Sequence, residues 1–258
     1  MIQLDYSEMF LIKDFFKNMD DTVILSCLQG HMGRAWTDNK TTPGGALIQT
    51  GDFCFLAGDV SSIGFKDIIR HMPVLTGLKE ALVITDNKYT AELLISVHAD
   101  VEKISRYAIK KNTAGFPVEK LRAFVQNLPD DFSISPITEE WYDDVVKEPW
   151  SKDFVSNFQS KEDFFKKGIG RIVIYKDKVV SGASSYTVYD DGIEIEIVTN
   201  QNYRRLGLAR AAGAALLLAC IEKDLYPSWD AANMSSVKLA EQLGYEYSHT
   251  YDTYVVRG

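Results

Sequence analysis

The sequence predicts an α/β (α+β) protein in two parts, a smaller α/β domain followed by a domain in which helices flank a mixed, mostly antiparallel sheet. Three observations predict this class. Runs rich in β-branched residues alternate with helical patterns along the chain. A segment at 124–136 with two prolines and two aspartates divides it. After this segment, three strand-like runs follow one another through connections of hairpin length. The predicted domains are 1–129 and 130–258.

In the first part, short apolar runs predict strands and two amphipathic patterns predict short helices. The strands are expected within 46–60, interrupted at 51–52, and over 81–85 and 101–112, and the helices over 67–72 and 90–94. His31, His71 and His98 are scattered without the spacing of metal ligands, so no metal is predicted. This part contains no phosphate-binding loop and no nucleophile elbow.

In the second part, strands and helices alternate in a regular order. Strands are expected over 131–137, 171–175, 179–189, 193–199 and 226–232, with two more within 245–257, and helices over 139–147, 152–167, 208–224 and 235–243. The connections at 176–178 and 190–192 are short and contain turn residues, which predicts an antiparallel meander.

Composition excludes several classes of protein. The net charge of −8 argues against a nucleic-acid partner, which needs a concentrated basic surface. No apolar run approaches the roughly 20 residues of a membrane span, and the N-terminus lacks the pattern of a secretory signal. Cys27, Cys54 and Cys220 have no metal-type spacing and are expected to be small buried residues. A cytoplasmic protein is therefore predicted.

The segment YRRLGLA, at 203–209, precedes the most apolar helix. A helix N-terminus has unsatisfied N–H groups and the positive end of the helix dipole, which favours an anion. Gly207 and the small Ala209 would let a ligand approach the main chain, while Arg204 and Arg205 could bind phosphate oxygens. These features suit a pyrophosphate. A loop with an exposed basic pair and a capping glycine explains the same residues. A Rossmann or P-loop motif is absent.

The element order and two motifs resemble the GNAT superfamily of acyl-CoA N-acyltransferases. Residues 204–209 fit its signature Arg/Gln-x-x-Gly-x-Gly/Ala, and Asn233 followed by Leu-Gly-Tyr at 243–245 is similar to its second motif. The resemblance covers roughly residues 130–258, and residues 1–129 would be either a substrate-side domain or a degenerate GNAT-like half. The segments EPWSKDF, SGASSY, YDDGIEIEI and LYPSWDAAN are similar to the branch that includes zwittermicin A resistance proteins, which implies an N-terminal extension of this size.

The resemblance implies acetyl-CoA as co-substrate, with no metal, and the primary amine of a small molecule, such as an antibiotic-like aminopolyol, as acceptor. It places the pyrophosphate on the loop and the pantetheine beside the preceding strand end. Asn233, with Ser236 in the same helix turn, would contact the pantetheine or adenine side, although Asn233 is equally explained as a helix cap. The implied cofactor-binding residues are Ile197, Val198, Thr199, Arg204, Arg205, Leu206, Gly207, Leu208, Ala209, Asn233 and Ser236. A homodimer is an option that the sequence leaves open.

Two carboxylates are candidates for the catalytic base. Glu194 and Glu196 are two residues apart on a predicted strand and therefore lie on one face, opposite the isoleucines around them. Acyl transfer to an amine needs the amine deprotonated, and either carboxylate could accept the proton. A structural pair bonded to neighbouring groups is the alternative.

The tyrosine that many family members use as general acid, seven residues after the asparagine, is replaced by Ala240. Tyr226, Tyr245 and Tyr247 are candidates for this role by proximity alone. The replacement keeps a second function open, an acyl-CoA sensor without turnover. In a third possible function, residues 1–129 would bind a partner protein, and residues 130–258 would serve as a scaffold for them.

Overall fold

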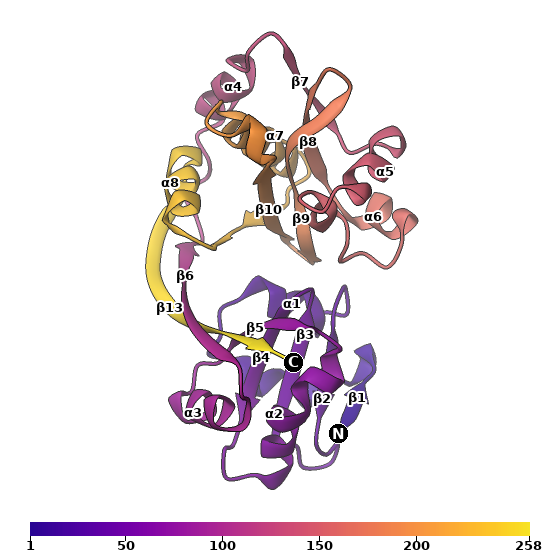
Figure 1. The fold of residues 1–258 in the computed structure, drawn as a ribbon, viewed down its shortest axis with the longest axis vertical. Helices are drawn as coiled ribbons and strands as arrows, with labels where there is room; N and C mark the ends of the chain where they lie inside the picture. The colour runs from indigo at the N-terminus through magenta and orange to yellow at the C-terminus, as the bar shows by residue number, and fades with distance from the viewer. The chain divides into compact units, whose positions relative to one another are not determined.

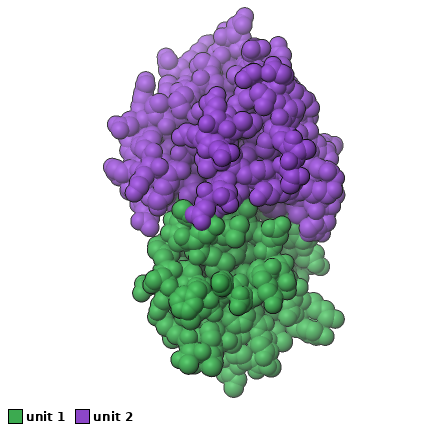
Figure 2. All heavy atoms as spheres, turned by 180° about the vertical axis from the view of Figure 1, so that it is seen from behind, with its two compact units in different colours: residues 1–106, 251–258 green, residues 107–250 purple.

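A computed structural model describes all 258 residues, which form two compact units (Figure 2). Unit 1 contains Met1–Arg106 and Tyr251–Gly258, and unit 2 contains Tyr107–Thr250. The chain crosses from one unit to the other inside two long strands, β6 (Val101–Lys110) and β13 (Glu246–Arg257). Hydrogen bonds join the strands into two sheets, in the orders β1-β2-β3-β4-β5-β13-β6-β12 and β11-β10-β9-β8-β7 (Figure 1).

Unit 1 begins with a short strand and three short helices, followed by an antiparallel meander. Its elements before β6 are β1 (Ile2–Leu4), η1 (Tyr6–Leu11), η2 (Lys13–Phe16), α1 (Thr22–Leu28), β2 (Arg34–Thr37), β3 (Gly45–Thr50), β4 (Phe53–Gly58), α2 (Ile63–Thr76), β5 (Glu80–Ile84) and α3 (Lys88–Val97). Strand β5 lies parallel to β4, which α2 connects to it. A right-handed crossover through a helix is the usual way to join parallel neighbours.

Both faces of the unit 1 sheet are covered by apolar side chains. On one face, Cys54 and Leu56 of β4 pack in a cluster with α2 residues such as Phe65. On the other face, Phe55 and Ala57 pack in a second cluster with residues of η1, η2 and α1. Alternate residues of β4 therefore enter two separate cores, which is why the strand reads as a continuous apolar run.

Unit 2 has a meander of long strands with helices before and after it. Its elements are α4 (Val118–Gln126), β7 (Phe132–Pro136), α5 (Glu139–Lys147), η3 (Lys152–Phe154), α6 (Lys161–Lys167), β8 (Gly170–Tyr175), β9 (Lys178–Tyr189), β10 (Gly192–Thr199), η4 (Gln201–Tyr203), α7 (Leu208–Glu222), β11 (Tyr226–Ser228), β12 (Asp230–Ala231) and α8 (Met234–Leu243). The predicted meander is confirmed, because β8, β9 and β10 pair antiparallel in succession.

Helix α7 packs directly on this meander and is buried along nearly its whole length. Gly213, in the middle of the helix, permits the close approach. A Cβ at this position would lie 2.9 Å from Leu243 Cδ1 and 3.1 Å from Ile197 Cδ1. The helix is apolar on all sides because α4, β8, β9 and β10 surround it.

The structure differs from two element predictions. The helix predicted over 152–167 is interrupted, since α6 begins only after Ser160, whose hydroxyl caps it by accepting a bond from Asp163 N at 3.2 Å. The Ser and Asn residues before this cap compete with helical hydrogen bonds. The two strands predicted within 245–257 form the single strand β13. Its sheet neighbour is β6, more than 100 residues earlier, so no local pattern reveals its continuity.

The first part also contains elements that the sequence does not predict. Strands β1 and β2, helices α1 and α4, and the full length of α2 are missing from the prediction, whereas strands β3 to β6 are confirmed. The compact units divide after Arg106 and after Thr250. That residues 1–129 and 130–258 behave as separate domains stays a prediction.

The three cysteines are buried and unpaired, as expected. No helix in the chain is long and apolar enough to cross a membrane. No group of three or more His, Cys, Asp or Glu side chains is arranged to hold a metal ion.

Candidate functional site

The loop between β10 and α7 bends sharply at two residues. Arg205 and Gly207 have φ of +65° and +78°. These values lie in the left-handed region, which residues other than glycine rarely adopt. Helix α7 starts after Gly207, and no side chain caps its N-terminus. By contrast, Ser62 caps α2 and Asn233 caps α8. The first-turn amides of α7 therefore keep their hydrogen-bonding capacity for an external acceptor.

The surroundings of this helix end are open and basic. Arg204, Arg205, Leu206 and Gly207 are all exposed. A Cβ on Gly207 would have only Arg210 Nη2 near it, at 3.5 Å, so the glycine is needed for its φ and not for packing. Arg204 Nε lies 3.4 Å from the carbonyl oxygen of Thr199, at the end of β10. The site combines two guanidinium groups with the positive end of the α7 dipole, which favours an anion such as a pyrophosphate.

The sheet of unit 2 splits beside β10. Strand β11 pairs in parallel with β10 over three residues only, the last being Glu194 with Ser228. The chain then leaves β10, because β12 pairs with Tyr107 and Ala108 of β6 instead. From Ile195 to Thr199, β10 is paired with β9 on one edge and with no strand on the other. An extended ligand could add to this edge by main-chain hydrogen bonds.

The side-chain direction of Ile197 places its neighbour Glu196 on the face of β10 that points away from α7. The side chain of Ile197 contacts the α7 side at Gly213, and successive residues of a strand point to opposite faces. The register of β10 with β9 shifts between Glu194 and Ile195, so a common face for the two carboxylates stays a prediction. Their role in catalysis stays a prediction.

The two carboxylates have different surroundings. Glu194 is buried, with 8% of its surface exposed, and its Oε1 accepts a hydrogen bond of 2.7 Å from the main-chain N–H of Asp230. This bond bridges the split, because Asp230 opens β12 while Glu194 is the last residue of β10 paired with β11. Glu196 is only half-buried and lies on the segment with the open edge. Glu194 is therefore suited to hold the split in shape, while Glu196 is the more exposed of the two carboxylates.

The candidate tyrosines are engaged in other contacts. Tyr245 is buried and donates a 2.6 Å hydrogen bond to the carbonyl oxygen of Pro227, and burial raises its pKa well above the ordinary value. The hydroxyl of Tyr226 accepts a bond from Asn112 N at 2.5 Å, and burial raises its pKa also. Tyr247 lies 2.8 Å from the hydroxyl of Thr250, on an exposed part of the chain. Tyr245 thus fixes the strand end and cannot reach a ligand.

Ala240, at the position of the usual tyrosine, is completely buried in α8. A large side chain there would have to displace the packing of this helix. The structure offers no replacement hydroxyl at this point of the helix. A thiolate is a tolerable leaving group near neutral pH, so the reaction does not require one.

Asn233 has the cap geometry that the sequence left as an alternative. Its side-chain oxygen accepts a bond of 3.0 Å from Ser236 N, and the residue is exposed. Cap and ligand contact are compatible, because the amide group of the same side chain has two donors. The sequence did not identify two supporting features, the bridge from Glu194 to Asp230 and the packing role of Gly213. A glycine inside a buried helix was the only local signal of the latter.

Comparisons with known proteins find similar proteins over most of the chain. The sequence model of the family described as "GNAT acetyltransferase" matches residues 13–254. The chain is 26% identical over 232 residues to the uncharacterized N-acetyltransferase YdfB of Bacillus subtilis (strain 168), covering 86% of this chain and 85% of that protein. The match spans both units, so the N-terminal part is not a separate addition to the family pattern.

Solved structures show the same fold. The crystal structure of a GCN5-related N-acetyltransferase-like protein from Streptococcus suis 89/1591 superposes with a TM-score of 0.89 at 37% identity, over 97% of this chain and 99% of that one. A GCN5-related N-acetyltransferase from Kribbella flavida is similar at a TM-score of 0.56 and 14% identity, over 83% and 86% of the two chains. The similarity to the Kribbella flavida protein, at 14% identity, shows a shared fold only.

Proposed function

Because the chain belongs to the GNAT acetyltransferase family, we propose that unit 2 transfers the acetyl group of acetyl-CoA to the primary amine of a small molecule. The protein is an acyltransferase of GNAT type, which disfavours the alternative of a sensor without turnover. One observation carries the proposal. The uncapped, arginine-flanked start of α7 lies at the end of β10, whose open edge and carboxylate face adjoin it.

The residues present fit the donor. Backbone amides from Arg205 to Ala209 and the guanidinium groups of Arg204 and Arg205 would hold the pyrophosphate. The open edge of β10 from Ile197 to Thr199 would bind the amide-containing pantetheine arm as an added strand. Asn233 would contact the same ligand through its amide donors while it caps α8.

The carboxylate face would receive the acceptor. Glu196, half-buried beside the open edge, attracts a cationic amine and takes a proton from it, directly or through water. The amine nitrogen attacks the thioester carbonyl carbon, the N–C bond forms, and the C–S bond breaks. The second proton of the nitrogen passes to the leaving sulfur or to water, so that the products are the neutral amide and coenzyme A. Glu194 positions the strands by its bond to Asp230 N. The aminopolyol class is the proposed acceptor because two carboxylates close together on β10 favour a compact, positively charged amine.

A turnover experiment with the full chain tests the proposal. Release of coenzyme A from acetyl-CoA is followed with a panel of amines that includes aminopolyols, aminosugars and polyamines, and mass spectrometry identifies the acetylated product. We expect amine-dependent release for at least one compound and none without amine. The matched variants Arg204→Ala and Arg205→Ala should weaken acetyl-CoA binding about tenfold to a hundredfold each. A protein that neither binds acetyl-CoA nor turns over any amine contradicts the proposal.

Two other expectations remain predictions. A cytoplasmic location would supply acetyl-CoA, and fractionation of expressing cells would test it. A homodimer is tested by the mass of the purified protein in solution.

A further inference from the structure

Units 1 and 2 repeat the same order of elements, although the sequence shows no repeat. Each has a short strand, a group of short helices, a three-stranded meander, a helix, a strand parallel to the last meander strand, a second helix and a long strand; unit 2 has α4, η4 and β12 in addition. In unit 1 the meander is β2-β3-β4 and the following helix is α2. In unit 2 the meander is β8-β9-β10 and the following helix is α7.

The long last strand of each unit continues into the other unit and completes its sheet there. Residues 251–257 of β13 enter unit 1 between β5 and β6, and Tyr254–Arg257 pair with β5. Residues 107–110 of β6 enter unit 2, where Tyr107 and Ala108 pair with β12. The repeat therefore includes an exchange of final strands.

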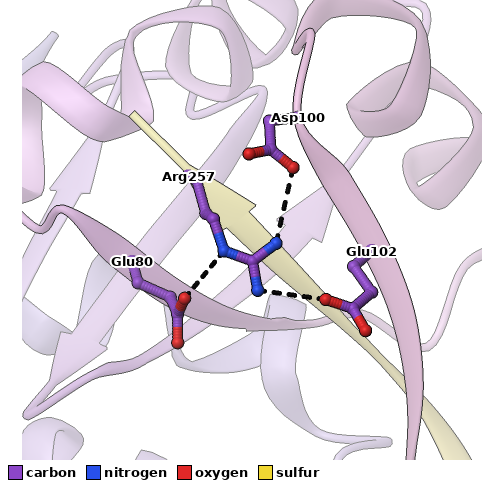
Figure 3. Close-up of polar contacts among 4 residues, drawn as sticks. All are labelled: Glu80, Asp100, Glu102 and Arg257. Atoms are coloured by element: carbon purple, nitrogen blue, oxygen red, sulfur yellow. Dashed lines mark hydrogen bonds and ion pairs between the residues drawn. The ribbon is translucent and has the colours of Figure 1, made fainter.

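Side-chain contacts fix both exchanged segments. In unit 1, the guanidinium of Arg257 binds Glu80 at 2.8 Å, Glu102 at 3.0 Å and Asp100 at 3.4 Å (Figure 3). These carboxylates come from β5, from β6 and from the residue before β6. In unit 2, Lys110 of β6 forms an ion pair with Glu246 of β13.

Strand pairing gives the correspondence between residues of the two units. Three pairs join β10 to β11 before the sheet splits, and the last is Glu194 with Ser228. Three pairs join β4 to β5 as well, and the last is Phe55 with Ile84. Glu194 therefore corresponds to Phe55, and Glu196, two residues later, corresponds to Ala57.

In unit 1, apolar residues occupy the two positions that correspond to the glutamates of unit 2. Phe55 is fully buried and Ala57 is 3% exposed, and both pack against residues of η1, η2 and α1 such as Phe16 and Ile24. Neither side chain can accept a proton. The positions that carry two carboxylates in unit 2 belong to a hydrophobic core in unit 1.

The donor side of unit 1 is also different. The loop before α2 is Asp59-Val60-Ser61-Ser62, without arginine or glycine. Ser62 caps the helix, and the Asp59 carboxylate accepts bonds from Ser61 N at 2.8 Å and Ser61 Oγ at 2.7 Å. The Asp38 carboxylate lies against the first turn of α2, because a Cβ on Gly64 would be 2.1 Å from its Oδ2. Two carboxylates at this helix end repel a pyrophosphate.

We infer that unit 1 is a second copy of the unit 2 fold that takes no acyl-CoA, so that each chain binds one acyl-CoA, at the loop before α7. This inference rests on the proposed function of unit 2. Unit 1 then has a structural role, because its last strand, β6, supplies residues 107–110 to unit 2.

Titration calorimetry of the full chain with acetyl-CoA tests the inference by its stoichiometry. We expect one acetyl-CoA per chain. Gly207→Val should abolish this binding, while Asp59→Ala in unit 1 should leave affinity and stoichiometry unchanged. Hydrogen exchange of the wild-type protein gives a second measurement that needs no variant. Acetyl-CoA should protect amides within 195–209 and leave those within 53–66 unchanged.

The possible outcomes separate the two proposals. Two acetyl-CoA molecules per chain, protection within 53–66, or binding that persists in a folded Gly207→Val protein would overturn the inference while leaving an acetyl-CoA-binding protein. No binding by the wild type would overturn both the inference and the proposed function.

Discussion

Among single residues, Glu194 and Glu196 lie two positions apart on β10 and differ in burial. Glutamine can still accept the hydrogen bond from Asp230 N, but it cannot take a proton. We therefore expect Glu196→Gln to lower kcat/KM about 100- to 10,000-fold, the usual cost of losing a general base. Glu194→Gln should retain most activity, and acetyl-CoA affinity should persist in both variants.

The pH dependence of kcat/KM distinguishes the base from a structural residue. In the wild type the rate should fall at low pH, as the base or the amine becomes protonated. Glu196→Gln should lose the limb that belongs to the carboxylate and keep the limb of the amine. Wild-type turnover by Glu196→Gln would show that this side chain is structural, and equal losses in both variants would assign the base to the pair.

The cysteines permit a prediction on reactivity and alkaline stability. Burial raises the pKa of Cys27 and of Cys220 from 9.0 to about 12, and it raises that of Cys54 as well. A raised folded-state pKa contributes stability that is complete below the unfolded value and is lost as pH rises toward the folded value. The free energy of unfolding should thus be insensitive to these thiols below pH 9.0 and decline between pH 9.0 and about 12.

Thiol labelling checks the same burial. We expect no rapid reaction of the native protein with a thiol reagent near neutral pH, and three reactive thiols after denaturation. Rapid labelling of the native protein would contradict the buried positions.

At the scale of secondary-structure elements, the N-terminus of α8 depends on Asn233. Asn233→Ala removes the acceptor for Ser236 N and should cost about 1 kcal/mol in the free energy of unfolding, whereas Asn233→Ser keeps a cap and should cost little. Urea unfolding measures this difference. If the side-chain amide of Asn233 also contacts acetyl-CoA, Asn233→Ser should weaken acetyl-CoA binding while the free energy of unfolding stays unchanged. An unchanged affinity would mean that Asn233 only caps the helix.

At the scale of the whole molecule, the end of the chain is part of the unit 1 sheet. The hydrogen bonds that Arg257 donates to Glu102 and Glu80 raise its pKa, so the guanidinium stays charged over the whole range in which the protein is folded. Its contribution to stability is present below the unfolded pKa and would be lost only above the raised value, so it should not vary with pH through titration of Arg257 itself.

Salt should affect this cluster because its side chains are partly exposed. We expect Arg257→Ala to lower the melting temperature at low salt, with a smaller difference at high salt. Arg70→Ala is the matched control, since Arg70 forms a single exposed ion pair with Asp67 and should change the melt much less. Equal effects of the two substitutions would contradict an anchoring role for Arg257.

Local sequence patterns predict the main features of unit 2. The meander, the buried helix after Gly207 and the Asn233 cap follow from patterns within a few residues, because turn chemistry, helical periodicity and capping act at short range. The strand that carries Glu194 and Glu196 follows from alternation in the same way. Similar patterns predicted four strands of unit 1 and left out its first elements.

Pairing between distant segments completes the sheets, and the local patterns do not predict it. The split beside β10, the bond from Glu194 to Asp230 and the repetition of unit 2 in unit 1 depend on pairing between distant segments. The two separate strands predicted in place of β13 were wrong for the same reason, whereas the continuous helix predicted over 152–167 was wrong because local Ser and Asn side chains compete with helical hydrogen bonds. The chain alone does not reveal a partner strand more than 100 residues away, because nothing in a local pattern records which edge a strand will meet.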